Sequence, residues 1–272
     1  YASAGYTEST ADQVYSGHSL IAENGAVLKE NGKVVDSGYM IVQDCDLGRI
    51  NAERRKNPSF QQAAYFYGSR EYLIEPMRGN KQLRSDGVLY PVQKLPFIPA
   101  TKAERESYCM DVFRIQAAGL AQRLKTINSN AVIGISGGLD STLALLVCVE
   151  AMRILGRPMT DIYGVTMPCF GTSDRTYNNS WELMKTLGIN AKEISIKNAV
   201  TLHFEDIGHD KNVHNGTYEN SQARERTQIL MDYASVVNGI VVGTGDLSEL
   251  ALGWCTYNGD HMSMYGVNAS IP

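Results

Sequence analysis

One stretch constrains this chain more than any other: the apolar residues 131–135, the sequence Ser136-Gly-Gly-Leu-Asp-Ser141, and the apolar residues 143–149. A partly β-branched run, a glycine pair and a second apolar run predict a buried strand, a tight turn and a helix. The free N–H groups and partial positive charge at a helix start can hold a phosphate. The stretch therefore predicts an anion-binding loop at the end of a strand.

The residues of this loop suggest how an anion would be held. Gly137 and Gly138 let the backbone approach it without a Cβ in the way, and Ser136 and Ser141 add hydroxyl donors. Asp140 would repel a phosphate, so its presence indicates Mg²⁺ between carboxylate and phosphate oxygens. The loop lacks the Walker A lysine and the G-x-G-x-x-G spacing. A simple helix cap with a glycine turn is the alternative interpretation.

Composition excludes several classes of partner. The 272 residues carry a net charge of −4 and are 43% hydrophobic, so no global basic field indicates nucleic acid. No apolar run is long enough to cross a membrane. The five cysteines are odd in number and form no C-x-x-C pair, which favours a reducing cytoplasm and small core residues over disulfides or zinc.

The pattern predicts two domains, residues 1–100 and 101–272. In the first, two Asn-Gly pairs predict hairpin turns at Asn24 and Asn31. They separate predicted strands over residues 16–23, 26–30 and 39–45. Asp46 begins a capped helix that runs to about residue 55. Five of the eight prolines lie between residues 56 and 101, which predicts connecting structure with a boundary near residues 95–99.

The second part alternates helices and strands. Helices are predicted over residues 104–125, 139–155, 176–187 and 219–238, and strands over 131–135, 162–167, 190–196 and 239–243. This alternation predicts an α/β fold with a parallel sheet and helices on both faces. Ligands of such sheets bind beyond the carboxyl ends of the strands, where Ser136, Met167 and Thr244 fall.

A second motif is Asn220-Ser-Gln-Ala-Arg-Glu-Arg226, near the start of the last long helix. Asn220 and Arg224 are four residues apart and share a helix face. Arg226 lies about 200° further round and should point to solvent or an interface. Arg224 is therefore predicted to clamp a phosphate, because guanidinium matches phosphate oxygens in pairs. A solvated helix face is the alternative.

A third motif, Thr244-Gly-Asp-Leu-Ser-Glu249, repeats the logic of the first. A threonine hydroxyl ends a buried strand and carboxylates follow as a new helix begins. Glu249 is predicted to share a Mg²⁺ ion with Asp140, the two acids arriving from different strands. The alternative is that Asp246 and Ser248 merely cap the helix.

Together the three motifs, continued by residues 250–268, resemble glutamine-dependent NAD synthetases, members of the N-type ATP pyrophosphatases. Residues 1–10 and 16–25 resemble the late part of their nitrilase-like glutaminase domain. The resemblance implies an adenine-nucleotide α-hydrolase-like (Rossmann-like) domain behind the C-terminal part of an α-β-β-α domain. The resemblance implies that the sequence is truncated at both ends, with the glutaminase Glu-Lys-Cys triad upstream and a phosphate-binding lysine downstream. We therefore expect no glutaminase activity from this chain.

The implied reaction is ATP-dependent amidation of deamido-NAD to NAD through an adenylated intermediate, with ammonia supplied from glutamine. The resemblance assigns pyrophosphate and metal binding to Ser136, Gly137, Gly138, Asp140 and Ser141, and metal binding also to Glu249. It assigns contacts with ATP phosphates to Arg224 and Thr244 and contact with adenine to Met167. Asp260 is assigned to the nicotinate end of deamido-NAD. The intact protein is expected to be a cytoplasmic homo-oligomer. The alternatives are another N-type pyrophosphatase, such as a GMP synthetase or a tRNA-thiolating enzyme, and a catalytically silent ATP-binding chain.

Overall fold

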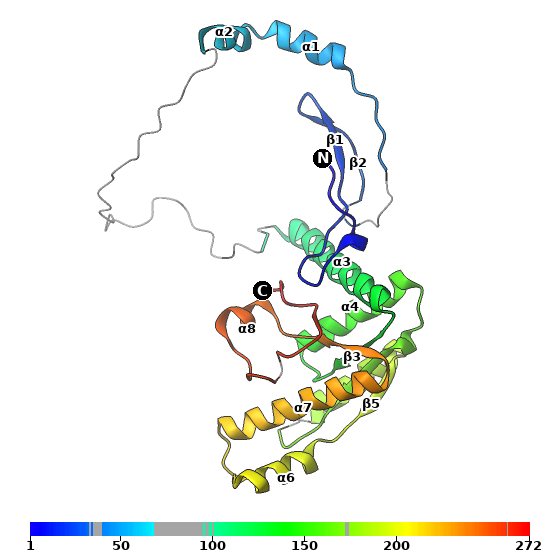
Figure 1. Ribbon diagram of the computed structural model, residues 1–272, viewed down its shortest axis with the longest axis vertical. Coiled ribbons are helices and arrows are strands. Elements are labelled where there is room, and N and C mark those ends of the chain that lie inside the picture. Colours follow the sequence, from blue (N-terminus) through cyan, green and yellow to red (C-terminus); the bar gives the residue numbers. More distant parts are fainter. Residues whose placement is uncertain are drawn as a thin grey trace, which may run out of the picture.

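The computed structural model describes residues 1–32, 34, 40–67, 95, 98–99, 101–171, 174–259 and 261–272. These residues form a small two-stranded sheet near the N-terminus and a five-stranded sheet in the second half of the chain (Figure 1). Two residues of the expected domain boundary near residues 95–99, 96 and 97, lie outside the described residues. Within the described part, we find no helix with the length and apolar character that crossing a membrane requires.

The N-terminal sheet is a hairpin of β1 (Leu20–Glu23) and β2 (Ala26–Glu30), preceded by the short 3₁₀ helix η1 (Tyr6–Glu8). Asn24 and Gly25 form its turn with φ angles of 49° and 81°, and two positive φ values match the twist of antiparallel strands. The hairpin predicted at Asn24 is therefore confirmed.

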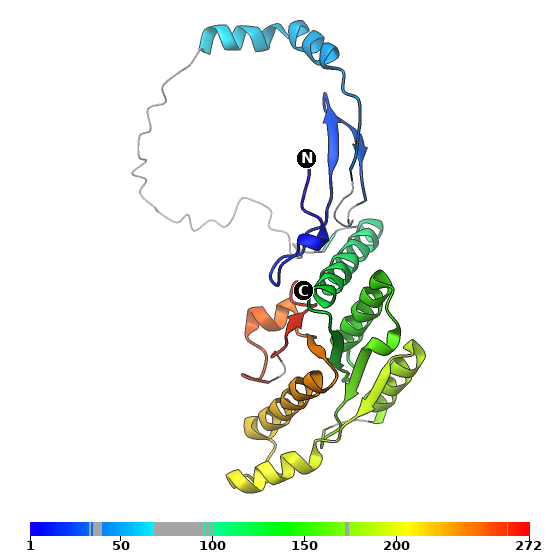
Figure 2. The same cartoon turned by 45° about the vertical axis from the view of Figure 1, so that its right-hand side comes forward.

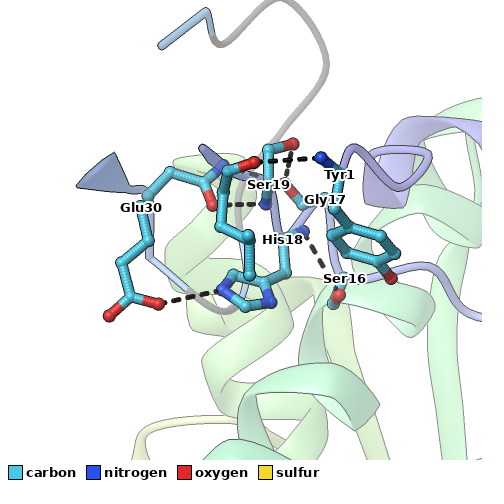
Figure 3. A network of polar contacts seen from close by, with 8 residues as sticks. Tyr1, Ser16, Gly17, His18, Ser19 and Glu30 are labelled. Carbon is cyan, nitrogen blue, oxygen red and sulfur yellow. Dashed lines mark hydrogen bonds and ion pairs between the residues drawn. The ribbon is translucent and has the colours of Figure 1, made fainter. Parts of the chain in front are cut away.

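The chain's first residues lie alongside this hairpin (Figure 3). The backbone of Leu20 donates to the carbonyl of Tyr1 over 2.9 Å. His18 Nε2 and Glu30 Oε2 lie 3.3 Å apart across the strands. Asn31 does not form the second predicted turn: it is buried, accepts from Ser19 N at 2.7 Å and donates to a carbonyl at 2.8 Å. Its side chain bonds the backbone of Gly17 and Ser19, and residues 31 and 32 form no turn, so the prediction of a turn at Asn31 was wrong.

Two further N-terminal predictions need correction. Residues 40–45 form no strand, contrary to the prediction over 39–45; the first residue of that range, Tyr39, lies outside the described residues. Helix α1 (Leu47–Lys56) begins as predicted, with Asp46 accepting from Arg49 N. A second helix, α2 (Pro58–Tyr67), occupies part of the stretch expected to be connecting structure. Pro58 stands at its first position, where a proline costs a helix nothing, so proline did not mark a break.

The large sheet contains β3 (Asn130–Gly134), β4 (Ile162–Thr166), β5 (Asn190–Glu193), β6 (Gly239–Gly243) and β7 (Tyr265–Gly266). All neighbouring pairs are parallel, in the order β5-β4-β3-β6-β7. The chain builds outward from β3 through β4 to β5, then returns to add β6 and β7 on the other side. The order therefore reverses between β3 and β6, and open α/β sheets bind ligands beyond the strand ends at this position.

Helices cover both faces of the sheet (Figure 2). Helices α3 (Lys102–Ile127), α4 (Leu139–Leu155) and α5 (Asp174–Leu187) contribute to one apolar cluster, and α6 (Lys197–Ile207) and α7 (Gly216–Val236) to another. Ile133 of β3 belongs to the first cluster and Val132 to the second, as expected when side chains alternate across a strand. The predicted three-layer α/β fold is confirmed.

Besides α2, helix α6 and strand β7 were not predicted. No side chain caps the start of α6, and two of its apolar residues, Leu202 and Ile207, are at least half exposed. Of its residues, only Val200 and Phe204 are buried. Strand β7 has just two residues, and it exists because β6 offers a free edge to pair with.

Candidate nucleotide-binding site

The glycine loop connects β3 to α4 as predicted. Gly138 is the residue before the first helical turn, and Leu139 begins α4. Ser136 Oγ accepts from Gly138 N at 3.3 Å and lies 3.1 Å from Ser141 Oγ. Ser141 is buried and Ser136 is exposed, and both hydroxyls make contacts within the loop.

Gly137 has the backbone conformation on which the loop depends. Its φ of +83° lies in the left-handed region, and a Cβ at this position would overlap the carbonyl oxygen of Thr176 on α5. Ser180 Oγ holds that same carbonyl over 2.8 Å. Because α5 presses against the loop here, only glycine lets the chain turn in the available space.

The second loop, after β6, leads into α8 (Leu247–Leu252) through a reciprocal cap. Asp246 Oδ1 accepts from Glu249 N at 2.7 Å, and Glu249 Oε2 accepts from Asp246 N at 3.1 Å. Asp246 therefore does cap the helix, as the alternative interpretation held. In this cap, the Glu249 carboxylate accepts through Oε2. Metal binding by Glu249 stays a prediction.

Asn268 joins the two loops and was not singled out from the sequence. Its side-chain Nδ2 donates to the carbonyl of Asp140 at 3.0 Å and to that of Thr244 at 3.1 Å. The predicted site residues after β3 and β6 are thus brought to the same edge of the sheet. An asparagine after a two-residue strand carries no periodic or motif signal, so local sequence could not identify it.

The two arginines of α7 lie differently from the prediction. Asn220 and Arg224 do share a face: Asn220 accepts from Thr256, and Arg224 Nε donates to the carbonyl of Tyr257 at 3.2 Å. That face meets the segment after α8, and Arg224 is exposed. Arg226 does not point to solvent, because its Nε lies 3.4 Å from the carbonyl of Met167.

Arg226 is directed inward because it lies on the helix row that packs on the sheet. Leu230, one turn further along this row, contacts Gly134 at the end of β3, where the end of the Met167 side chain also lies. Met167 directly follows β4, so the Arg226 guanidinium stands near the carboxyl ends of the strands. Phosphate binding by Arg224 stays a prediction, while the geometry favours Arg226 for this role.

We therefore expect Arg226→Ala to weaken ATP binding by about 10- to 150-fold, since contacts to a charged group contribute roughly 1.5–3 kcal/mol. Arg224→Ala is the matched control, and we expect it to cost about 0–1 kcal/mol of ATP binding, as exposed charges do. Isothermal titration of both variants with a non-hydrolysable ATP analogue compares them. A larger loss for Arg224→Ala would restore the assignment made from helix periodicity.

Arg224 instead lines a cavity of about 570 Å³ formed by α6, α7 and the residues Asn258 and Met262. Its lining residues are Val200, His203, Ser221, Arg224, Glu225, Thr227, Gln228, Met231, Asn258 and Met262. The predicted site residue Asp260 lies outside the described residues, but its neighbours Asn258 and Met262 line this cavity. The cavity mixes apolar walls with amides and charges, which suits a small organic ligand.

The cysteines fit their predicted role only in part. Cys148 is buried in the core, and burial raises the pKa of its thiol to about 12, so it stays protonated and unreactive. Cys45, Cys109 and Cys255 are exposed, contrary to the prediction that each fills a core position. All five are free thiols.

The chain is similar in sequence to known proteins of one family. A sequence profile described as NAD synthase matches residues 113–266. A relative from Mycobacterium leprae, "Glutamine-dependent NAD(+) synthetase", is 40% identical over the whole chain, which spans 41% of that relative. An "NH(3)-dependent NAD(+) synthetase" from Fusobacterium nucleatum is 34% identical over 48% of this chain and 48% of its own length.

A solved structure of similar fold is the glutamine-dependent NAD⁺ synthetase of Acinetobacter baumannii in complex with ADP. Its TM-score is 0.55 at 24% sequence identity, over 60% of this chain and 30% of that one. The profile match runs from α3 through the glycine loop to β7 and so contains every strand of the large sheet. The chain belongs to the NAD synthase family.

Proposed function

We propose that this protein carries out ATP-dependent amidation of deamido-NAD to NAD. The observation that carries the proposal is the glycine loop with Asp140 at the point where the strand order reverses. The relatives' names, glutamine-dependent and NH(3)-dependent NAD(+) synthetase, support the substrate assignment. The family match disfavours the GMP synthetase and thiolation alternatives, whose chemistry belongs to other families.

In this proposal the glycine loop holds the pyrophosphate portion of ATP. The N–H groups at the start of α4 and the hydroxyl of Ser136 stabilise the charge that develops on the leaving group. The nicotinate carboxylate attacks the α-phosphorus, the bond to the β-phosphate oxygen breaks, and pyrophosphate leaves. Ammonia then attacks the acyl carbon and AMP departs with one carboxylate oxygen. Holding the two anions together supplies much of the rate enhancement.

Mg²⁺ is part of the proposal, and the chain's residues fit it. No group of three or more acidic, histidine or cysteine side chains gathers in the described ranges. Mg²⁺ does not require one, because it usually takes one or two carboxylates together with water and substrate phosphates. Asp140 and Glu249 lie in the first turns of α4 and α8, which follow the two loops that Asn268 joins, so these carboxylates would hold the ion. When bound, the ion would neutralise charge on the phosphates.

We further propose that deamido-NAD occupies the cavity lined by Arg224, with its nicotinate end toward Asn258 and Met262. The guanidinium would then meet a phosphate of the dinucleotide rather than of ATP. Residues 1–32 and 40–67 would belong to a glutaminase domain, and ammonia would come from glutamine in a cytoplasmic homo-oligomer. The free cysteines are consistent with a reducing compartment.

Release of pyrophosphate by the full-length protein tests the proposal. With ATP and ammonia present, pyrophosphate should appear only after deamido-NAD is added, in equal amounts with NAD and AMP. Production of ADP and inorganic phosphate instead would contradict it. ATP binding without any turnover would favour the catalytically silent alternative.

A further inference from the structure

Asn268 is a deeply buried polar side chain beside the two loops. It is 1% exposed and follows β7 at the edge of the sheet. An amide nitrogen has two hydrogens, and its two contacts, to the carbonyls of Asp140 and Thr244, use both. One side chain thus bonds the first turn of α4 to the end of β6.

The orientation of this amide is set from outside the two loops. Gln116 of α3 donates from Nε2 to Asn268 Oδ1 at 3.1 Å and to the carbonyl of Val267 at 2.8 Å. If the Asn268 amide turned over, its oxygen would face two carbonyl oxygens and its nitrogen would face a donor. Gln116 therefore fixes the one arrangement in which both loop carbonyls are satisfied.

The residues that follow Asn268 also contact the second loop. The carbonyl of Ile271 accepts from Leu247 N at 2.8 Å, at the first residue of α8. Residues 268–271 thus contact the starts of both α4 and α8. These helix starts carry Asp140 and Glu249, the two carboxylates assigned to the metal.

We propose that Asn268 is a positioning residue that sets the spacing of the glycine loop and the Thr244 loop for the triphosphate of ATP. This inference rests on the proposed function. A phosphate chain held from two loops needs both within a fraction of an ångström of their working positions. Removing the amide leaves two loop carbonyls without this partner and lets the helix starts separate. Adenine is assigned to Met167, which follows β4, so the adenosine part of the ligand would depend less on the spacing of the two loops.

The test compares ATP with AMP in the Asn268→Ala variant of the full-length protein. Isothermal titration uses a non-hydrolysable ATP analogue and AMP as probes. We expect the dissociation constant of the analogue to rise at least tenfold and that of AMP less than threefold. A general loss of stability would weaken both nucleotides alike, so their ratio separates positioning from structure.

Asn130→Ala is the matched control. Asn130 also bridges elements of the sheet, donating to the carbonyl of Val237 at 2.8 Å and accepting from Arg157 at 2.6 Å, but at the amino end of β3. We expect it to lower the melting temperature comparably and to change both dissociation constants less than threefold. Gln116→Ala, at a half-buried position, is the second variant if Asn268→Ala does not fold; we expect two- to fivefold weaker binding of the analogue alone.

Equal losses of ATP analogue and AMP, or losses matched by the Asn130 variant, would overturn the inference and leave the proposed function intact. An unchanged analogue affinity in both Asn268→Ala and Gln116→Ala would overturn it as well. A wild-type protein that bound neither nucleotide would instead refute the proposed function, and this inference with it.

Discussion

Gly137→Ala is expected to reduce ATP affinity by about 100-fold or more, equivalent to about 3 kcal/mol. A residue with a Cβ pays roughly 1–2 kcal/mol to adopt the left-handed conformation that Gly137 has. The methyl group would also overlap the carbonyl of Thr176, which cannot retreat because it belongs to α5 and accepts from Ser180. The loop must therefore move out of its binding conformation. Titration with a non-hydrolysable ATP analogue measures the loss.

Gly156→Ala is the matched control, because Gly156 ends the same helix with a φ of +63° and has no heavy atom within 4 Å of an added Cβ. It should destabilise the protein by about 1–2 kcal/mol and leave ATP affinity within twofold of wild type. If Gly137→Ala bound ATP as well as Gly156→Ala does, the glycine loop would not be the nucleotide site.

Asp140→Asn is expected to weaken Mg·ATP by about 30-fold or more and metal-free ATP by less than threefold. The carboxylate is assigned to hold the cation, and an amide is a much poorer ligand for Mg²⁺. Without the cation, removing a negative charge beside the phosphates should even favour binding. Titrations in excess Mg²⁺ and in chelator measure the two affinities.

Glu150→Gln gives the same change of charge on the same helix, at a residue paired with Arg153 at 3.2 Å. It should leave both affinities within twofold, since exposed pairs of this kind contribute about 0–1 kcal/mol. Equal weakening of Mg·ATP and free ATP by Asp140→Asn would mean that Asp140 only stabilises the start of α4, where acids are favoured by up to about 1 kcal/mol.

The strands and helices around the glycine loop were predictable because their signals are local. Apolar runs of five residues and the glycines after them determine β3, β6 and the turns that follow. Both loops then meet at one edge because parallel strands place their carboxyl ends together. The resemblance to a family came from the same short stretches, which is why fold and family were predicted together.

The orientation of α7 was mispredicted, although the sequence contained a usable signal. Helix geometry gives the angle between Arg224 and Arg226 but not which of them faces the sheet. Leu230 and Ala234 lie four and eight residues after Arg226 and pack toward the sheet, so their row identifies the inner face. The prediction instead chose the face that Arg224 shares with Asn220.

Other features depend on contacts between distant residues, and no local pattern could have revealed them. Asn268 meets Asp140 across 128 positions and Gln116 across 152. Strand β7 forms only because β6 presents an edge to it. Asn31 is followed by glycine, a pair that is typical of turns. Here its side chain instead bonds the backbone of Gly17 and Ser19, contacts that the pair did not predict.

The central claim, amidation through an adenylated carboxylate, is tested most directly by following oxygen. The full-length protein converts deamido-NAD, labelled with ¹⁸O in both carboxylate oxygens, in the presence of ATP and ammonia. The masses of the products are then measured by mass spectrometry. The account predicts one ¹⁸O in AMP and one in the amide of NAD, because the attacking oxygen leaves with AMP. AMP without label, or labelled inorganic phosphate accompanied by ADP, would contradict it.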